Sequence, residues 1–325
     1  MRIVPGRMSL VELRNYFLRG TRVPSRDLLR RLDQDPRQGA QQIAALARRR
    51  RQLAERERRR MHALLALERS LWEQGLERVA GVDEVGVGPL AGPVVAAAVT
   101  FPPGTYIAGL KDSKQLLREE RVELAESIRR QAQSISIAQA TVAEVNALNP
   151  YHAALLAMRR AVEGLEFRPQ QVLVDARTIP EIDIPQRSVI QGDEKHFSIA
   201  AASVIAKEWR DGLMRALDRR YPGYGFACHK GYSTPQHQAA IRQLGPCELH
   251  RESYSFVQEL AGNCSHSFYR LKGLINELDT RNDLVSLRRD MLLASDLAPS
   301  EVRKLRLLLH RRSRRLPQPT QMKLL

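Results

Sequence analysis

The spacing of apolar residues along this chain changes near residue 78 and again near residue 257. From about residue 8 to residue 76, apolar positions recur at the three- to four-residue spacing of an amphipathic helix. Between Ala40 and Leu76 no proline interrupts the pattern, which predicts one long helix. Residues 1–77 are therefore predicted to form a helical N-terminal extension.

Short runs of β-branched and small apolar residues dominate residues 78–256. Two runs flank a turn rich in glycine and proline, a pattern that predicts an early hairpin of Val79–Val85 and Val94–Phe101. Further strands are predicted at Ser134–Thr141, Gln171–Val174 and Arg187–Ile190, and helices at Ser113–Gln131, Ala153–Leu165 and Ile199–Arg220. Early strands followed by strand–helix alternation favour an α/β fold, with a mixed sheet covered by helices on both faces.

The last segment, residues 257–325, returns to helical spacing. Short helices are predicted at Leu271–Leu278, Leu284–Leu293 and Ser300–Leu309, followed by a flexible basic tail that begins at His310. This C-terminal extension is expected either to pack on the body of the protein or to fray. Its sequence indicates no particular chemistry.

The charge of the chain is strongly basic and unevenly distributed. Its 325 residues carry a formal net charge of +16, and a balance this basic favours polyanionic partners, nucleic acid first. Residues 1–77 hold 18 basic and 9 acidic residues, residues 78–256 hold 21 and 20, and residues 257–325 hold 13 and 7. This distribution predicts a nearly neutral catalytic body between two basic arms.

The longest basic run, Arg48–Arg51 followed by Arg56 and Arg58–Arg60, lies in the long predicted helix. Such a run can be a solvated helix face or a surface that contacts phosphates. The small number of nearby acids favours phosphate contact. Aromatic residues make up only 5% of the chain, so base stacking is not expected to be the main mode of binding.

Several classes of protein are not expected. The three cysteines, Cys228, Cys247 and Cys264, lack the C-x-x-C spacing of zinc sites, and their odd number does not suit a disulfide framework. We expect reduced thiols in a cytoplasmic protein. The sequence shows neither a signal-peptide pattern nor an apolar stretch of membrane-spanning length. We therefore expect no membrane attachment, and we expect a monomer.

Two adjacent carboxylates, Asp83 and Glu84, stand at the end of the first predicted strand, before a glycine-rich turn. Carboxylates beside an apolar strand are costly unless a metal or a hydrogen-bond donor neutralises them. The glycines of the turn allow a ligand to approach the backbone closely. Acidic pairs are also common on solvated loops, so this pair by itself leaves both interpretations open.

Two further acids follow β-branched runs: Asp175 ends the run Val172–Val174, and Asp193 follows Val189 and Ile190 after a glycine. In open α/β sheets, ligand-binding groups gather beyond the carboxyl ends of the strands. Each aspartate alone could lie in a loop or cap a helix. Together with Asp83 and the glycine turn, they predict one shared site.

Oxygen ligands without histidine or cysteine select hard cations, so the predicted ions are Mg²⁺ or Mn²⁺. A site with two ions could activate water and stabilise the leaving oxygen of a phosphodiester, and Asp83 is the candidate for a bridging ligand. Glu84 is harder to place, because neighbouring residues of a strand point to opposite faces. It would have to sit at a bulge or bind a metal through its backbone carbonyl.

Polar groups suited to a phosphate backbone surround these acids in the sequence. They are Lys114 after a glycine-containing loop, Ser203 on a helix that opens with small residues, Lys207 one turn later, and Tyr232 in a polar loop. For each of them taken singly, ordinary surface polarity is the alternative explanation.

Several long motifs follow one another along the chain: GVDEVG-GPLAGPVVAAAV, LKDSK-L, VLVD, GD, SIAAASVIAK–RD, YPGYGFACHKGYSTPQH and HR-SYSF. Over about residues 78–256 they resemble bacterial ribonuclease HII. The stretch DPRQGAQQIAALARRR is similar to the N-terminal extension of some longer members. Residues 257–325 resemble nothing known in that family.

The resemblance implies a ribonuclease H-like fold, with a mixed five-stranded sheet flanked by helices. It implies metal-dependent cleavage of the RNA strand of RNA–DNA hybrids and on the 5′ side of single ribonucleotides in duplex DNA, leaving 3′-hydroxyl and 5′-phosphate ends. The family's catalytic and metal-binding carboxylates correspond to Asp83, Glu84, Asp175 and Asp193. Its elements that sense the ribose 2′-hydroxyl correspond to Gly86, Val87, Gly88 and Tyr232.

Three positions depart from the family pattern. Val87 replaces the usual arginine of the turn, Ala176 replaces the glycine after the third acid, and Gln191 replaces the lysine before Gly-Asp. Two cations near the site are thus missing, and we hypothesise that the basic arms compensate. Two alternatives stay open: a catalytically weak hybrid-binding protein on the same frame, and another ribonuclease H-like nuclease that acts on DNA.

Overall fold

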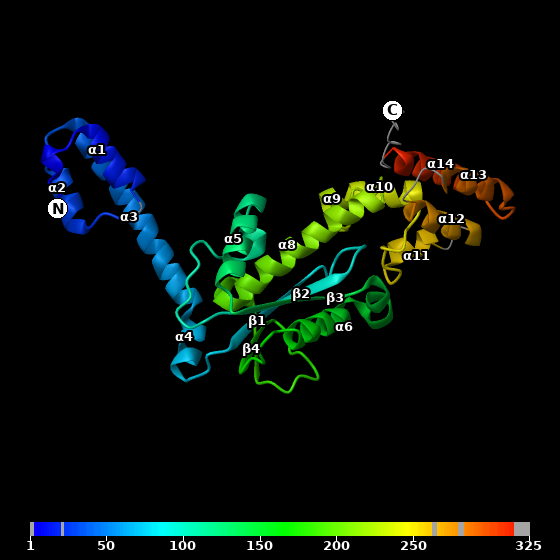
Figure 1. The fold of residues 1–325 in the computed structure, drawn as a ribbon, viewed down its shortest axis with the longest axis horizontal. Helices are drawn as coiled ribbons and strands as arrows, with labels where there is room; N and C mark the ends of the chain where they lie inside the picture. Colours follow the sequence, from blue (N-terminus) through cyan, green and yellow to red (C-terminus); the bar gives the residue numbers. More distant parts are fainter. Residues whose placement is uncertain (1–2, 21–22, 262–264, 279–282, 315–325) are drawn as a thin grey trace, which may run out of the picture. The chain divides into compact units, whose positions relative to one another are not determined.

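The structure is a computed structural model that describes residues 3–20, 23–261, 265–278 and 283–314. The chain forms two compact units, one from Met1–Leu67 with Tyr106–Leu110 and one from Glu68–Thr105 with Lys111–Leu325. Figure 1 follows the elements of both units along the chain. This grouping places the C-terminal helices in the same unit as the sheet, and the division into domains at residues 77 and 256 stays a prediction.

The first unit is helical, as the sequence predicted. Its elements are the 3₁₀ turn η1 (Pro5–Arg7), α1 (Leu10–Arg14), the π-helical turn η2 (Asn15–Arg19), α2 (Arg26–Asp33) and α3 (Gln38–Leu64). Apolar side chains of α1, η2, α2 and the first half of α3 form its core, among them Leu13, Phe17, Leu32 and Ile43. The long predicted helix breaks after Leu64, and α4 (Ala66–Glu73) follows.

The second unit contains a mixed five-stranded sheet, which confirms the predicted fold class. Its strands are β1 (Val79–Val85), β2 (Val94–Thr100), β3 (Ser134–Ala140), β4 (Gln171–Asp175) and β5 (Gln186–Val189), in the order β3-β2-β1-β4-β5. The first three strands pair antiparallel, whereas β4 pairs parallel with both β1 and β5. The carboxyl ends of β1, β4 and β5 therefore meet at one edge.

Helices cover both faces of this sheet (Figure 1). On one face, Ala80 and Val82 of β1 pack with side chains of α6 (Val142–Glu163). On the other face lies α8 (Phe197–Arg220), so close to β1 that a Cβ at Gly81 would come within 2.1 Å of the Ser198 carbonyl carbon. Alternate residues of β1 therefore face α6 and α8 in turn.

Several helix boundaries differ from the sequence prediction. The helix predicted over 113–131 is a 3₁₀ turn, η3 (Ser113–Gln115), followed by α5 (Arg118–Gln131). Helix α6 begins earlier than predicted and is kinked before Pro150, where Asn149 has a φ of 68°. Four short helices were not predicted, because polar or loop-forming residues dilute their apolar pattern: α7 (Gly192–Lys195), α9 (Phe226–His229), α10 (Pro235–Leu244) and α11 (Ser255–Ala261).

The C-terminal helices are packed and not frayed. Phe268 and Leu271 of α12 (His266–Asn276) and Leu305 of α14 (Pro299–Ser313) share a buried cluster with Tyr221, which follows α8, and with Leu244 of α10. Helix α13 (Asp283–Leu293) adds Leu287 and Met291 to that cluster. The predicted flexible tail is wrong at its start, because His310–Ser313 is helical, and its remainder from residue 315 lies outside the described residues.

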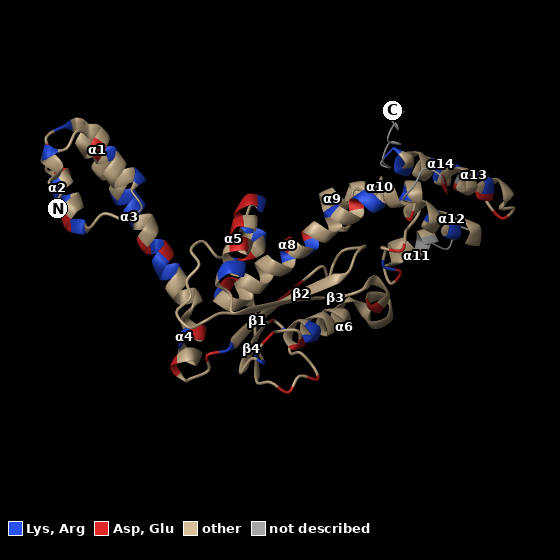
Figure 2. Ribbon diagram, viewed as in Figure 1, with Lys and Arg blue, Asp and Glu red and all other residues tan. Residues whose placement is uncertain are grey.

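Arginine and lysine residues are frequent along α3 and α14, where Figure 2 colours them blue on the ribbon. Within the described ranges, no helix has both the length and the apolar character that a membrane span requires. Cys228 and Cys247 are free thiols, and Cys264 lies outside the described residues.

Candidate active site

Asp83 lies on the face of β1 that is covered by α8. It is buried, with 6% of its surface exposed, and burial raises the pKa of its carboxyl well above the ordinary value. The nearby carboxylates of Glu84, Asp175 and Asp193 raise this pKa further, whereas a hydrogen bond from Ser203 lowers it. Ser203 and Ser113 are joined by a hydrogen bond of 2.9 Å between their hydroxyl oxygens. Asp83 is thus a desolvated acid surrounded by other acids.

Asp175 ends β4 on the same face, since Val172 and Val174 belong to the core on the α6 face. Its Oδ1 accepts a hydrogen bond of 2.7 Å from the backbone N–H of Gly192. Burial raises its pKa, and the neighbouring Asp193 adds to that rise. The structure thus brings Asp83 and Asp175 together at the ends of adjacent strands.

Asp193 lies in α7, the short helix that follows β5, and is buried with 5% of its surface exposed. Its Oδ2 accepts a hydrogen bond of 3.1 Å from Nζ of Lys114, whose side chain is 77% exposed. Burial raises the pKa of Asp112, and the contact of its side chain with Asp193 raises it further. Asp112 is an acid of this site that the sequence analysis did not single out, although it precedes Ser113 and Lys114 in a quoted motif.

Glu84 points to the opposite face. The pairing of β1 with β2 continues without interruption from Ala80 to Val85, so the bulge considered for Glu84 is not present. Its Oε1 accepts a hydrogen bond of 2.9 Å from Nη2 of Arg177, and its buried Oε2 has no hydrogen-bond partner. Burial raises the pKa of Glu84 and the Arg177 charge lowers it. The other option, a metal contact through the Glu84 carbonyl, stays a prediction.

The fit of these residues to divalent ions can be judged from their charges and donor atoms. As they stand, no three acid, histidine or cysteine side chains in the described ranges converge closely enough to hold a metal ion. Lys114 and Arg177 instead compensate Asp193 and Glu84. Asp83, Asp175 and Asp193 nevertheless form an all-oxygen set whose mutual repulsion a divalent cation would relieve. The set therefore fits Mg²⁺ or Mn²⁺ in donor type and charge, with side-chain rearrangement.

Two buried arginines, Arg210 and Arg251, contact the glycine turn after β1. Gly86 has a φ of +91°, and a Cβ there would lie 2.2 Å from Nε of Arg210. Arg251 is fully buried and donates hydrogen bonds to the carbonyls of Gly86, Val87 and Gly92. A Cβ at Gly88 would meet nothing within 4 Å, so this part of the turn is open to a ligand. Arg210 lies in the motif SIAAASVIAK–RD and Arg251 in HR-SYSF, but only their contacts reveal this role.

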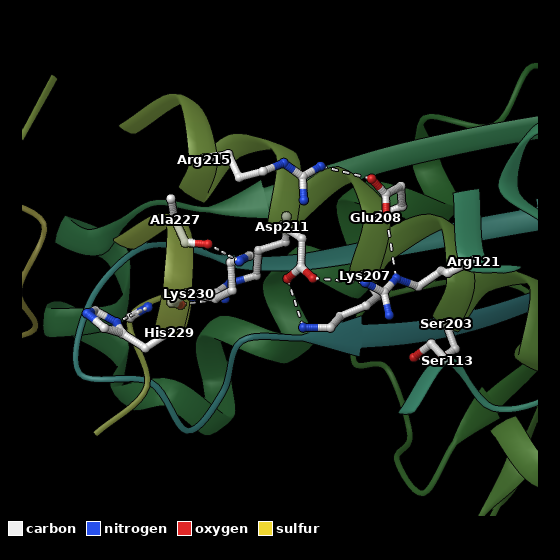
Figure 3. A network of polar contacts seen from close by, with 12 residues as sticks. Ser113, Arg121, Ser203, Lys207, Glu208, Asp211, Arg215, Ala227, His229 and Lys230 are labelled. Atoms are coloured by element: carbon white, nitrogen blue, oxygen red, sulfur yellow. Dashed lines mark hydrogen bonds and ion pairs between the residues drawn. The ribbon is translucent and has the colours of Figure 1, made fainter. Parts of the chain in front are cut away.

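Lys207 and Tyr232 lie beside each other, with Nζ of Lys207 6.0 Å from the centre of the Tyr232 ring. The tyrosine is 40% exposed. Nζ of Lys207 also donates a hydrogen bond of 2.8 Å to Asp211, which in turn pairs with Arg121. Figure 3 shows this network along α8, including Glu208 between Arg121 and Arg215. It holds the Lys207 side chain against the helix and beside the tyrosine.

Comparison with known proteins agrees with these features. The family model described as "Ribonuclease HII" matches residues 80–257, and the model "Ribonuclease HII N-terminal domain" matches residues 12–72. A "Ribonuclease HII" of Myxococcus xanthus is 50% identical over 256 residues, which cover 78% of this chain and 87% of that protein. Another, of an Anaeromyxobacter species, is 48% identical over 257 residues, covering 79% and 82%.

Among solved structures, the crystal structure of ribonuclease H2 from Pyrococcus horikoshii covers 57% of this chain and 97% of its own, with 24% identity and a TM-score of 0.49. Both family models end before α12 begins, so the C-terminal helices α12 to α14 lie outside the matched residues.

Proposed function

Because the chain belongs to the ribonuclease HII family, and is therefore an endonuclease of ribonuclease H type 2, we propose its substrates and its cofactor. The substrates are RNA–DNA hybrids, cleaved in the RNA strand, and duplex DNA with single embedded ribonucleotides, cleaved on their 5′ side. The products carry 3′-hydroxyl and 5′-phosphate ends. The cofactor is a pair of Mg²⁺ or Mn²⁺ ions.

The observation that carries the proposal is the grouping of Asp83, Asp175 and Asp193 on the α8 face, at the carboxyl ends of adjacent strands. Asp83 would contact both ions, Asp175 and Asp193 would each complete one, and Glu84 would contribute through its carbonyl. When bound, the ions supply a lowered pKa for the attacking water and charge stabilisation for the leaving oxygen. No side-chain general base is then required.

The remaining groups of the site would orient the substrate. Lys114 is exposed beside Asp193 and can form an ion pair with a phosphate of the cleaved strand. Lys207 can contact the backbone next to Tyr232, while Ser203 holds Asp83 in place. The open surface at Gly88 and the half-exposed Tyr232 are suited to read the ribose 2′-hydroxyl, which distinguishes RNA from DNA.

The decisive experiment uses a labelled DNA duplex with one ribonucleotide and maps the ends of the products. We expect a single cut on the 5′ side of the ribonucleotide with Mg²⁺ or Mn²⁺, no cut with EDTA, and no cut in an all-DNA duplex. The variant Asp83→Asn should lose cleavage by at least about a thousandfold, because its side chain no longer balances the ionic charge. Its circular dichroism should match that of the wild type.

Other results of that experiment would select the alternatives. Binding of the hybrid without cleavage in either metal would indicate a hybrid-binding protein. Cleavage of the all-DNA duplex would indicate another ribonuclease H-like nuclease. Cleavage by Asp83→Asn at the wild-type rate would refute the metal-binding role of Asp83. We further propose a monomer in the cytoplasm, which light scattering of the purified protein and its localisation in cells would test.

A further inference from the structure

Three buried histidines lie beneath the loop that carries Tyr232, and the proposed reaction uses none of them. His229 belongs to α9, His237 to α10, and His250 follows Cys247 in the loop before α11. The rings of His229 and His237 stack with centroids 4.2 Å apart, and those of His237 and His250 lie 5.2 Å apart. His237 and His250 are at most 2% exposed.

Backbone partners determine where the proton of each imidazole sits. Nδ1 of His250 lies 2.8 Å from the backbone N–H of Cys247 and 3.2 Å from the Cys247 carbonyl oxygen, and the shorter contact, to a group that can only donate, assigns a lone pair to this nitrogen. In a neutral imidazole, the other nitrogen, Nε2, must then carry the proton. His250 therefore presents an N–H at Nε2, directed towards α10.

The hydrogen bonds of His237 give a consistent assignment of its proton. Nδ1 of His237 lies 2.9 Å from the carbonyl oxygen of Tyr232, and a carbonyl can only accept, so Nδ1 carries the proton and Nε2 a lone pair. The two Nε2 atoms lie 3.1 Å apart. His250 thus donates to His237, and His237 donates to Tyr232. The bonds run in one direction from Cys247 to the Tyr232 carbonyl.

The loop is also joined to the glycine turn. Gly231 accepts a hydrogen bond of 2.9 Å from the N–H of Leu90, and its own N–H donates to Nδ1 of His229 at 3.2 Å. The loop and the turn are in close contact, since a Cβ at Gly231 would lie 2.3 Å from the Ala91 carbonyl oxygen. Gly231 also has a φ of +85°, which favours glycine at this position. A shift of the loop would therefore move both groups proposed to read the 2′-hydroxyl.

We propose that His237 and His250 are positioning residues that hold the Tyr232 loop in place for recognition of the ribose 2′-hydroxyl. This inference rests on the proposed function, since it assigns Tyr232 to the ribose. The two histidines act as neutral hydrogen-bond relays and not as metal ligands or proton donors to the substrate. In the described part of the chain, no three histidine, cysteine or acid side chains are arranged to hold a metal ion.

The activity test compares two substitutions at His250. In His250→Leu the donor is lost at nearly constant volume, whereas in His250→Gln the side-chain amide can still donate to His237. The exposed His152→Leu serves as a surface control. For each protein, kcat/KM is measured on a duplex with one ribonucleotide and on a continuous RNA–DNA hybrid, and the ratio of the two values is the readout.

We expect the ratio to fall by about tenfold in His250→Leu, the effect of one buried hydrogen bond, and to stay within about twofold of the wild type in His250→Gln and His152→Leu. A His250→Leu protein with the wild-type ratio would overturn the inference. An equal loss in His250→Gln would also overturn it, because packing alone would then explain the effect. A wild-type protein that does not cleave the single-ribonucleotide duplex would instead refute the proposed function.

Nitrogen NMR of the wild-type chain labelled in its histidines tests the relay without any activity. At pH 7 we expect neutral rings, with the proton on Nε2 of His250 and on Nδ1 of His237. The variants His250→Leu and His237→Gln assign the signals. The opposite tautomer, or a charged ring, at either position would overturn the inference even if the protein cleaves as proposed.

Discussion

Nη1 of Arg251 donates a hydrogen bond of 2.7 Å to the carbonyl oxygen of Val87, a residue 164 positions earlier in the chain. The same guanidinium donates to the carbonyls of Gly86 and Gly92 and is fully buried. The shape of the glycine turn therefore depends on a distant residue. Although Val87 lacks the cationic side chain usual at this position, its backbone is held firmly by Arg251.

Replacement of Arg251 by lysine should show how far the shape of the turn depends on the hydrogen bonds of this guanidinium. A lysine keeps the charge but cannot serve three carbonyls in fixed directions, so buried acceptors lose their partners. We expect Arg251→Lys to lower the free energy of unfolding by about 2–4 kcal/mol. Urea denaturation measures this change. Arg242→Lys, at an exposed arginine that stacks on Phe256, is the control and should change stability by less than about 1 kcal/mol.

Ala176 follows the candidate ligand Asp175 and has a φ of 49°. This left-handed conformation strains an alanine and favours glycine, the residue that the family usually has there. Ala176→Gly should therefore raise the free energy of unfolding by up to about 1 kcal/mol. Ala216→Gly, at an exposed position of α8, should lower it by about 1 kcal/mol. A decrease for both variants would show that Ala176 is not strained.

Two sets of arginines on α3 can be tested separately. Arg50 donates a hydrogen bond of 3.0 Å to the Phe17 carbonyl and Arg51 one of 2.8 Å to the Pro24 carbonyl, so both stabilise the first unit itself. Arg49, Arg56 and Arg59 are exposed on one side of the helix. The charge run is thus partly structural, and exposed arginines such as these three remain available for phosphates.

The triple variant Arg49→Gln, Arg56→Gln, Arg59→Gln should bind a ribonucleotide-containing duplex more weakly. If these residues contact phosphates, the slope of log K against log salt should become shallower by about 0.9 for each lost contact. Thermal stability should stay unchanged. The matched variant Arg50→Gln should keep the salt slope and lose about 1–2 kcal/mol of stability. An unchanged slope in the triple variant would contradict the predicted phosphate contact.

Acid should destabilise the protein through the buried histidines. Burial, together with the nearby His229, lowers the pKa of His237 from 6.5 to about 4. Burial also lowers the pKa of His250, with contributions from His237, Lys272 and His229. Between about pH 4 and pH 6.5 the unfolded chain binds a proton at His237 that the folded chain excludes, so the free energy of unfolding rises with pH in this range. The contribution of the neutral His237 to stability is complete above about pH 6.5 and is lost as the pH falls towards 4.

For His237 alone, the expected loss between pH 7 and pH 4 is about 3 kcal/mol. Urea denaturation at a series of pH values measures it. His237→Gln removes the titrating group, so the slope of stability against pH between 6.5 and 4 should be smaller in this variant than in the wild type. Identical slopes in both proteins would show that His237 does not exclude protons in the folded state.

The strands and the acids at their ends could be predicted because both are local features. The β-branched runs before Asp175 and Asp193 are visible in a few residues, and the parallel pairing of β4 with β1 and β5 then places their ends at one edge. The helical character of residues 10–64 was visible for the same reason, through its apolar period. The family motifs added the identity of the acids but not their orientation.

The orientation of Glu84 and the roles of Arg210 and Arg251 were not predictable in this way. Glu84 binds Arg177, 93 residues further along the chain, and Arg210 reaches the Pro93 carbonyl across 117 residues. Such contacts depend on which face of the sheet each helix covers. The packing of α12 to α14 on the main body was likewise left open, because their apolar faces indicate burial without naming the partner.

The sequence by itself determined the strands, the longer helices and the acids at the strand ends, since periodicity and charge act over a few residues. Only the tertiary structure decided that Asp83 and Glu84 face opposite sides of the sheet, that one guanidinium holds three carbonyls of the turn, and that His250 and His237 lead to Tyr232. The physical reason is that each of these contacts joins residues brought together by the packing of the whole unit, and the direction of a buried hydrogen bond is defined only when both of its partners are in place.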